Sequence, residues 1–207
     1  MTLSNAASLS QERRERAFQE AVSFNTFVEQ AQVNQQTLVS NFEAYAPNDQ
    51  QLDFLNDRQE PVDVLVLAHD WCGDVVANLP LFGRIAERTD KLRLHILNRD
   101  PDNGDIADLY KHADGRNHIP TYIFFDGSGQ ELGVFIERPA EISALLGGWV
   151  DAFWTEHPEL EGRGKPISAL EETPRRELLH FLKQRRAEVI GQEQDAILRE
   201  IQSIVSR

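Results

Sequence analysis

The sequence of 207 residues is poor in sulfur, with one cysteine and one methionine. A lone cysteine cannot form an internal disulfide, which excludes a small scaffold held together by disulfides. It also fits a reducing compartment, so we expect a cytoplasmic protein. The chain shows neither the leading apolar segment of a signal peptide nor an apolar run of membrane-spanning length. We therefore expect neither export nor insertion into a membrane.

Cations are also scarce: Lys and Arg number 21 against 34 Asp and Glu, which gives a net charge of −13. A surface with this excess of acid disfavours contact with nucleic acids and with anionic membranes, so we predict neither as a partner. The hydrophobic fraction of 41% is enough for a full core. The length and composition predict one domain with appendages.

The only cysteine, Cys72, lies where an apolar run gives way to a helical pattern. Residues 64–68 are apolar and rich in β-branched side chains, which is typical of a strand covered on both faces of a sheet. From Asp74 onward, apolar residues recur at helical spacing. Cys72 is therefore expected at a helix N-terminus, where free N–H groups and the helix dipole favour a thiolate. We expect a lowered thiol pKa.

The rest of the chain predicts alternating strands and helices. Strands are expected at 92–96, 122–125 and 131–136, with a hairpin turn at 126–129. Helices are expected at 10–30, 35–45 and 106–112 and from Pro139 to about residue 153. A polar linker at 157–174 precedes a C-terminal helical pattern that is interrupted at Gly191. The order predicts an α/β sheet with one parallel unit and a terminal hairpin.

The function of the N-terminal helical region has two interpretations. It either caps the sheet or a neighbouring helix, or it forms a lid or partner site over Cys72. Apolar stripes on helices are usually core, which favours the cap.

Two motifs carry a family resemblance. Trp71-Cys72-Gly73-Asp74, followed by Pro80, resembles the active-site motif of the thioredoxin superfamily, in which a proline lies five residues after the second cysteine. Ile119-Pro120-Thr121, directly before a predicted strand, is similar to the loop of that family that carries a cis-proline. Within the superfamily the chain resembles a bacterial branch of single-cysteine proteins with a W-C-G-D motif.

The resemblance covers roughly residues 63–153 and implies a thioredoxin-like α/β fold, a central mixed sheet flanked by helices. It divides the chain into an N-terminal helical extension (1–60), a thioredoxin-like domain (61–156), and a linker with a C-terminal helical extension (157–207). Two departures stand out: Val75 occupies the position of the resolving cysteine, and Val66 occupies that of a buried acid. Both remove parts of the resolving step and leave the attacking thiol in place.

The resemblance implies thiol-disulfide exchange at Cys72, in which a thiolate attacks a disulfide and forms a mixed disulfide. The candidate catalytic residues are Cys72, Asp74 and His69. The candidate partner-binding residues are Trp71, Gly73, Ile119 and Pro120, the last two because the proline loop of the family binds the extended backbone of a partner. The expected partners are proteins or small molecules that carry thiols or disulfides, and the chain is a monomer or a homodimer.

Several roles stay open. Asp74 is either a helix N-cap or first-turn acid, or its charge opposes the thiolate and raises the thiol pKa. His69 and His118 either transfer protons at Cys72 or face solvent at loop ends. A metal site at His69, Cys72, Asp74 and His118 lacks a ligand pair of the usual zinc type, so we predict no metal and no cofactor.

Three functions are compatible with the sequence. The first is monothiol exchange, which would make the chain a thiol-disulfide oxidoreductase without a resolving cysteine. The second is a redox-silent thioredoxin-fold module that binds a protein partner. The third, a transferase that uses a small thiol as cosubstrate, lacks a recognisable thiol-binding signature.

Overall fold

A computed structural model describes residues 8–206, so the first seven residues of the expected N-terminal extension lie outside it. The chain forms two compact units. The first contains the residues up to Glu137 and those from Leu198 on, and the second contains Arg138–Ile197. The domain boundaries expected from the sequence, at 60/61 and 156/157, stay a prediction.

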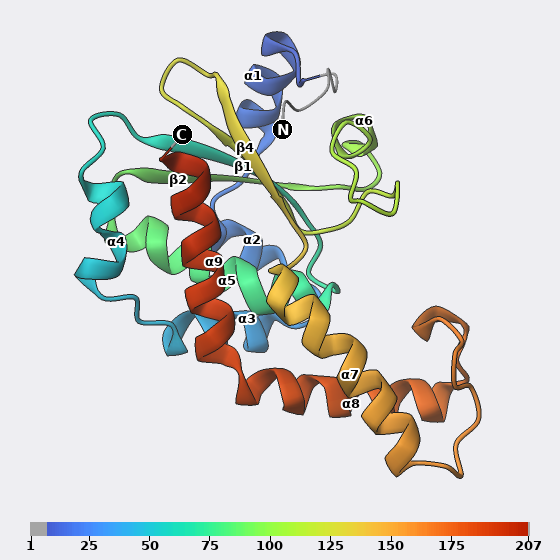
Figure 1. Cartoon of the computed structure of the whole chain (residues 1–207). Coiled ribbons are helices and arrows are strands. Elements are labelled where there is room, and N and C mark those ends of the chain that lie inside the picture. The colour runs from blue at the N-terminus through green and yellow to red at the C-terminus, as the bar shows by residue number, and fades with distance from the viewer. Residues whose placement is uncertain (1–7, 207) are drawn as a thin grey trace. The chain divides into compact units, whose positions relative to one another are not determined.

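The first unit is built on a four-stranded mixed sheet in the order β2-β1-β3-β4 (Figure 1). Strand β1 pairs in parallel with β2 and antiparallel with β3, and β3 pairs antiparallel with β4. The strands are β1 (Val62–Ala68), β2 (Leu92–Asn98), β3 (Thr121–Phe125) and β4 (Glu131–Ile136). With its flanking helices this is a thioredoxin-like α/β fold, as the sequence predicted. Residues 64–68 of β1 are fully buried, which explains their unbroken apolar run.

The helices of the first unit precede or connect these strands. They are α1 (Gln11–Glu20), α2 (Phe24–Gln30), α3 (Gln35–Ala44), α4 (Asp49–Asn56), α5 (Gly73–Arg88) and the short α6 (Gly104–Ala107). Helix α6 is displaced toward the N-terminus relative to the expected 106–112. The other bounds agree with the predicted periodicity to within a few residues, except at the N-terminus.

The expectation of one helix over residues 10–30 is wrong. Ser10 caps α1 as predicted, its Oγ accepting from the N–H of Arg13 at 3.3 Å, but the chain is extended at Val22. The N–H of Val22 donates to the carbonyl of Ile96 at 2.9 Å, and the N–H of Ile96 donates back at 3.0 Å. This bridge to the edge strand β2 supplies hydrogen bonds to the N–H and C=O groups of Val22, which would be paired within the helix if it continued. The next residue, Ser23, caps α2.

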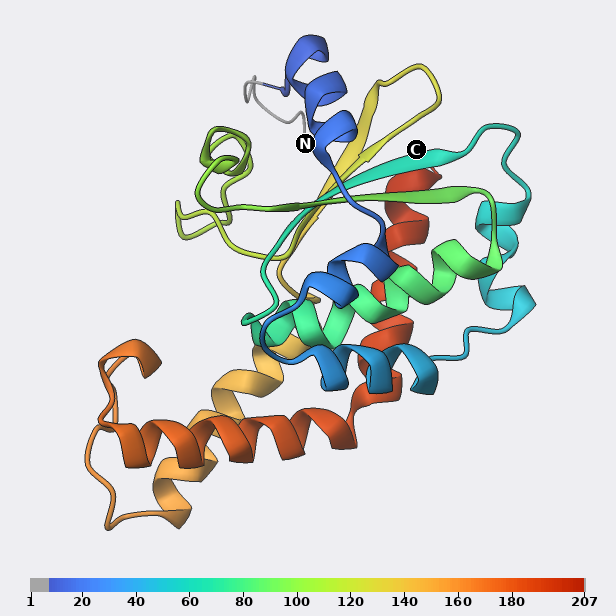
Figure 2. The same ribbon diagram turned by 180° about the vertical axis from the view of Figure 1, so that it is seen from behind.

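Helix α3 lies along α5, as Figures 1 and 2 show from opposite sides. The Nε of Arg84 on α5 donates to the carbonyls of Phe42 and Tyr45 at 3.1 and 3.0 Å, and its guanidinium lies 4.2 Å from the centroid of the Phe42 ring. These bonds satisfy carbonyls at the C-terminal end of α3. The contacts support the interpretation of the N-terminal region as a helical cap.

The second unit contains α7 (Ala140–Glu156), a 3₁₀ turn (Ile167–Ala169), α8 (Glu172–Glu188) and the first part of α9 (Ile190–Val205). Its core is Phe153, Trp154, Leu170, Leu178 and Leu182. Helix α8 begins inside the expected linker, and the break before α9 falls at Val189, two residues before Gly191.

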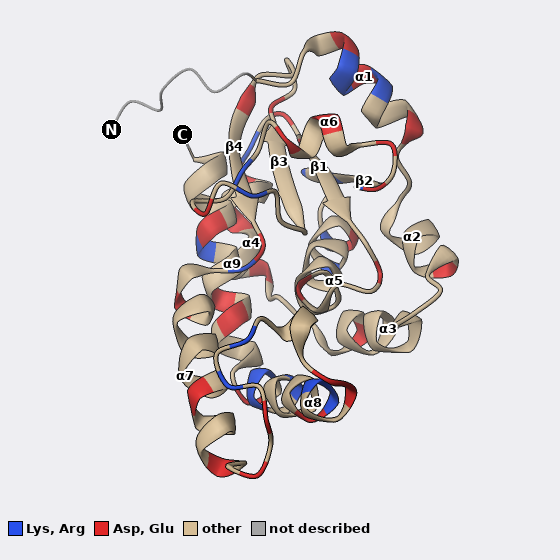
Figure 3. Ribbon diagram, turned by 90° about the vertical axis from the view of Figure 1, so that its right-hand side faces the viewer, with Lys and Arg blue, Asp and Glu red and all other residues tan. Residues whose placement is uncertain are grey.

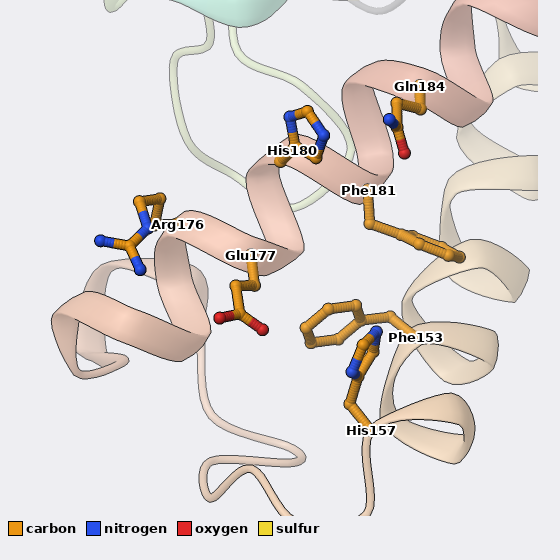
Figure 4. A pocket seen from close by; sticks show the side chains of 7 residues that line it. All are labelled: Phe153, His157, Arg176, Glu177, His180, Phe181 and Gln184. Atoms are coloured by element: carbon orange, nitrogen blue, oxygen red, sulfur yellow. The ribbon is translucent and has the colours of Figure 1, made fainter.

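Helix α8 carries five of the eight Lys and Arg residues of this unit (Figure 3). One of them, Arg186, forms an ion pair with Glu193 on α9, whose side chain is 1% exposed. Between α7 and α8 lies a recess of about 420 Å³ (Figure 4). Phe153 and Phe181 form its apolar side, with ring centroids 5.6 Å apart. No helix in residues 8–206 combines the length and the apolar character needed to cross a bilayer.

Candidate functional site

Cys72 lies at the junction between sheet and helix that the sequence predicted. Strand β1 ends at Ala68, and Cys72 is the residue that caps the N-terminus of α5, with extended backbone angles. Its carbonyl accepts from the N–H of Val76 at 3.0 Å, which begins the helix. The side chain is half-buried. Its position combines access from solvent with contact to the protein interior.

The sulfur of Cys72 faces the proline loop. Its S–H donates to the carbonyl of Ile119, with the Sγ and O atoms 3.3 Å apart. The Ile119–Pro120 peptide bond that follows is cis. Residues 47 positions apart in the sequence thus meet at the site. Only a protonated thiol can donate this bond, so it favours the neutral form.

The expectation of a lowered thiol pKa is wrong, because the pKa of Cys72 is raised. Burial of the sulfur is the largest cause, and the negative charges of Asp74 and Glu137 add to it. Hydrogen bonds from the N–H groups of Val75 and Asp74, at the start of α5, act in the opposite direction. The helix N-terminus therefore stabilises the thiolate as expected, but desolvation outweighs it.

Asp74 is the second residue of α5 and is buried, with 8% of its surface exposed. Cys72 holds the N-cap position, and Asp74 is an acid in the first turn of the helix, which is one form of the first role open from the sequence. Its charge also raises the pKa of Cys72, which is the second role. The acid beside the thiol thus disfavours the thiolate, in the same direction as burial.

His69 and Trp71 form one face of the turn before Cys72. Their rings stack with centroids 5.3 Å apart, and Trp71 is 56% exposed. The Nε2 of His69 accepts from the N–H of Asp100 at 3.1 Å, and the Asp100 carboxylate lies 3.4 Å from the same nitrogen. In the described residues the imidazole thus bonds to Asp100, not to Cys72. A catalytic role for His69 and a partner-binding role for Trp71 stay predictions.

The N-terminal extension anchors this turn from the other side. The carboxylate of Asp70 accepts from the N–H groups of Gln32 and Val33 at 2.6 and 2.9 Å. The side chain of Asn34 donates to the carbonyl of Asp70 at 2.9 Å. The loop between α2 and α3 therefore fixes the backbone two residues before Cys72. The sequence analysis missed Asp70, although an aspartate beside a backbone turn is a recurrent anchor.

Gly73 and Val75 occupy the first turn of α5. A Cβ added at Gly73 would meet nothing within 4 Å, and its φ lies outside the left-handed region, so the turn does not require glycine. A partner-binding role for Gly73 stays a prediction. Val75, at the position of the resolving cysteine, is 0% exposed and part of the core.

His118 and Glu137 lie behind the proline loop. The Nδ1 of His118 is 3.3 Å from the Glu137 carboxylate, and Asn78 on α5 donates to the carbonyl of Glu137 at 2.9 Å. The four-residue metal set weighed from the sequence does not form in the described part of the chain. There His118 clusters instead with His112 and Asp114.

Asp100 and Glu137 are further site residues that the sequence analysis left without a role. Asp100 pairs with Arg99 at 2.7 Å as well as with His69, and Arg99 reaches Asn117 at 3.3 Å. The sequence offers a signal for Asp100, the adjacent pair Arg99-Asp100 directly after the second strand. Glu137 has no local signal, because the hairpin of β3 and β4 brings it to the site.

Comparison with known proteins supports the fold. A family model described as "Thioredoxin" matches residues 21–155. A crystal structure of an HIV epitope scaffold is similar with a TM-score of 0.55 and 21% identity, covering 82% of this chain and 97% of that one. A protein of unknown function from Pseudomonas aeruginosa is similar with a TM-score of 0.55 and 18% identity, covering 86% and 99%. At these low sequence identities, the two similar structures support the fold and say nothing about function. No curated protein matches the sequence.

Proposed function

The chain belongs to the thioredoxin family, and from that premise we propose that Cys72 captures partners as mixed disulfides. The observation that supports this most is the hydrogen bond of the sulfur to the carbonyl of Ile119, which brings the thiol to the proline loop. In the reaction, the Cys72 thiolate attacks one sulfur of a partner disulfide. A new S–S bond forms, the old S–S bond breaks, and the other partner sulfur leaves as a thiolate.

The raised pKa of Cys72 affects both directions of this exchange. At neutral pH few molecules carry the attacking thiolate, so capture is slow. A thiol of high pKa is also a poor leaving group, so the mixed disulfide is released slowly when an external thiol attacks the partner sulfur. Because Val75 supplies no second thiol, release depends on such a thiol from a protein or a small molecule. The proposed activity is therefore capture and carriage with slow turnover, in a reducing compartment such as the cytoplasm.

Substitution of Val75 tests this proposal. In Val75→Cys the introduced thiol lies three residues after Cys72 in the first turn of α5, the spacing of the dithiol motif of the family. We expect the mixed disulfide with oxidised glutathione to form on Cys72 in the natural chain and to persist. In Val75→Cys it should resolve quickly into an internal disulfide, with release of reduced glutathione, as followed by mass spectrometry.

Two controls belong to the experiment. Ala86→Cys adds a second thiol to the same helix away from the first turn, and it should leave the lifetime of the mixed disulfide unchanged. Cys72→Ser should form no adduct. If the natural chain forms no adduct even at alkaline pH, the proposal fails.

The alternative is a redox-silent module that binds a protein partner. The exposed ring of Trp71, next to Cys72 in the chain, favours it, together with the valines at positions 66 and 75. Capture of partners by Cys72→Ala separates the two functions. Undiminished binding supports the module, whereas loss of partners that reducing agents release supports mixed-disulfide capture.

A further inference from the structure

A tight loop between α6 and β3 brings two histidines and an aspartate together. The N–H of His112 donates to the carbonyl of Arg116 at 2.8 Å, and the N–H of Gly115 donates to the carbonyl of His112 at 2.9 Å. Gly115 has φ +80°, which this reversal requires and which glycine adopts without strain. Lys111 and Asn117 form an antiparallel bridge across the loop. As a result the flanking residues His112 and His118 face each other.

The three side chains converge on one point. The Nε2 of His118 is 2.9 Å from Oδ2 of Asp114, and the Nδ1 of His112 is 3.9 Å from Oδ1. The two imidazole rings have centroids 5.3 Å apart. One ligand atom from each residue lies within 4.8 Å of the others. Around a tetrahedral zinc ion with bonds of about 2.0–2.1 Å, ligand atoms are about 3.4 Å apart, a distance that small side-chain rotations would reach here.

The second nitrogen of His118 has the partner that metal-bound histidines have. Its Nδ1 lies 3.3 Å from a carboxylate oxygen of Glu137, while Nε2 faces Asp114. A histidine that binds a metal through one nitrogen almost always donates its other N–H to a carboxylate, carbonyl or water, which fixes the tautomer and raises the basicity of the ligand. This outer contact comes from the end of β4, outside the loop, so it is independent of the loop geometry.

We propose that His112, Asp114 and His118 bind a divalent transition-metal ion of the zinc type, with Glu137 as the outer partner of His118. Two imidazoles select zinc and its neighbours over calcium and magnesium, which prefer oxygen ligands. Three protein ligands leave a fourth position open to water or to a ligand. His112 and Asp114 are nearly half exposed, which gives the ion a route to the site.

The site borders the thiol without including it. His118 directly precedes Ile119, whose carbonyl accepts from Cys72, and the carbonyl of His118 itself accepts from the hydroxyl of Thr121 at 2.6 Å. An ion bound here fixes the loop that faces the sulfur. Metal binding nevertheless needs no thiol, so it is independent of the function proposed for Cys72.

The test is a titration of the full, untagged chain with Zn²⁺ and with Co²⁺, in the Cys72→Ser background so that sulfur cannot contribute. We expect one Zn²⁺ per chain, and Co²⁺ absorption bands of a low-symmetry nitrogen and oxygen site. Glu137→Gln should weaken binding by about 10–100-fold, as is typical for an outer partner. His112→Asn and His118→Asn, which each remove a ligand, should weaken it further.

His157→Gln is the matched control. His157 also pairs with a carboxylate, that of Glu159 at 3.2 Å, but lies outside the cluster, so its substitution should leave the affinity unchanged. Should His118→Asn fail to fold, as judged by circular dichroism, His112→Asn at the exposed side of the loop decides the question. Zinc binding that survives His112→Asn with unchanged affinity, or that is absent from the Cys72→Ser chain, would overturn the proposal.

Discussion

At the scale of single residues, the charge of Asp74 adds to the effect of burial in raising the pKa of Cys72. Asp74→Asn removes one of the charges that raise the pKa of Cys72 and leaves the larger effect of burial in place. The thiolate fraction at neutral pH should therefore rise. Because nucleophilicity falls with the pKa, the alkylation rate should rise by less than the thiolate fraction does. Iodoacetamide labelling across a pH series measures both quantities.

The raised pKa of Cys72 also predicts how its alkylation rate depends on pH. Since the pKa of Cys72 is raised, the alkylation rate of the natural chain should keep rising beyond the pH at which an ordinary thiol has levelled off, and the Asp74→Asn profile should level off earlier. Asp53→Asn, an equal change of charge at an exposed position of α4, is the control and should leave the profile in place. Coincident profiles for Asp74→Asn and the natural chain would contradict the assigned role.

Substitution of Gly73 tests whether a partner approaches the first turn of α5. In Gly73→Ala the added methyl group meets no atom within 4 Å apart from its chain neighbours and the nearby backbone of its own helix. We therefore expect the fold to be kept and stability to rise by up to about 1 kcal/mol. The same methyl group adds bulk in open space at the residue next to Cys72, where we propose that a partner approaches. Capture of a folded protein disulfide should therefore slow several-fold, while the rate with a small disulfide changes little. Equal slowing of both rates would show that the effect lies in Cys72 itself.

At the scale of elements, α3 compensates for the proline inside α5. Pro80 has no N–H, so the carbonyl of Val76 four residues earlier loses its helical partner. The side-chain amide of Asn41 donates to that carbonyl at 2.8 Å, and the hydroxyl of Tyr45 donates to the next one, that of Ala77. The helical cap thus supplies hydrogen bonds that the family's helix proline removes.

A double-mutant cycle measures this coupling. Asn41→Ala leaves a part-buried carbonyl without a partner and should lower the free energy of unfolding by about 1–3 kcal/mol in urea titrations. In Pro80→Ala the new N–H can bond to Val76, so Asn41→Ala should cost about 1 kcal/mol less in that background. Gln36→Ala, on the exposed side of α3, should cost little in either. Strictly additive losses would show that Asn41 does not act on the carbonyl freed by Pro80.

The same elements show what could be predicted from the sequence and what could not. Local periodicity predicts strand β1, the turn at Cys72 and α5. The family motif around Pro120 predicts that this proline lies near the thiol. The extended residue Val22 was missed because its bonds come from Ile96 on β2, a partner remote in sequence. The cluster around His118 was missed although His112 and His118 have a spacing within the zinc range, since only the loop shows that they face each other.

The raised pKa of Cys72 was missed for a related reason. The sequence places a thiol at a helix N-terminus, which lowers the pKa, and that local effect is present in the structure. The opposing effect, burial, depends on tertiary packing, in which the proline loop 47 residues away contacts the sulfur. Local patterns thus predicted the position of the thiol, while tertiary packing determined the sign of its pKa shift.

At the scale of the whole molecule, the net charge of −13 should select among small disulfides. Cystamine is cationic and oxidised glutathione is anionic, so at low ionic strength cystamine should modify Cys72 faster, by up to about tenfold in excess of any intrinsic difference. Asp74 and Glu137 place two of these charges near the sulfur.

Varying the salt concentration measures the electrostatic contribution to the ratio of the two rates. Between about 0.01 and 1 M ionic strength the screening length falls from about 30 to 3 Å, so the ratio of the two rates should fall toward the ratio that a cysteine-containing model peptide gives. Adduct formation followed by mass spectrometry at matched pH measures both rates. A ratio that does not change with salt would mean that the acidic surface has no influence at Cys72, and that the choice of partner depends on contacts with the proline loop and Trp71 instead.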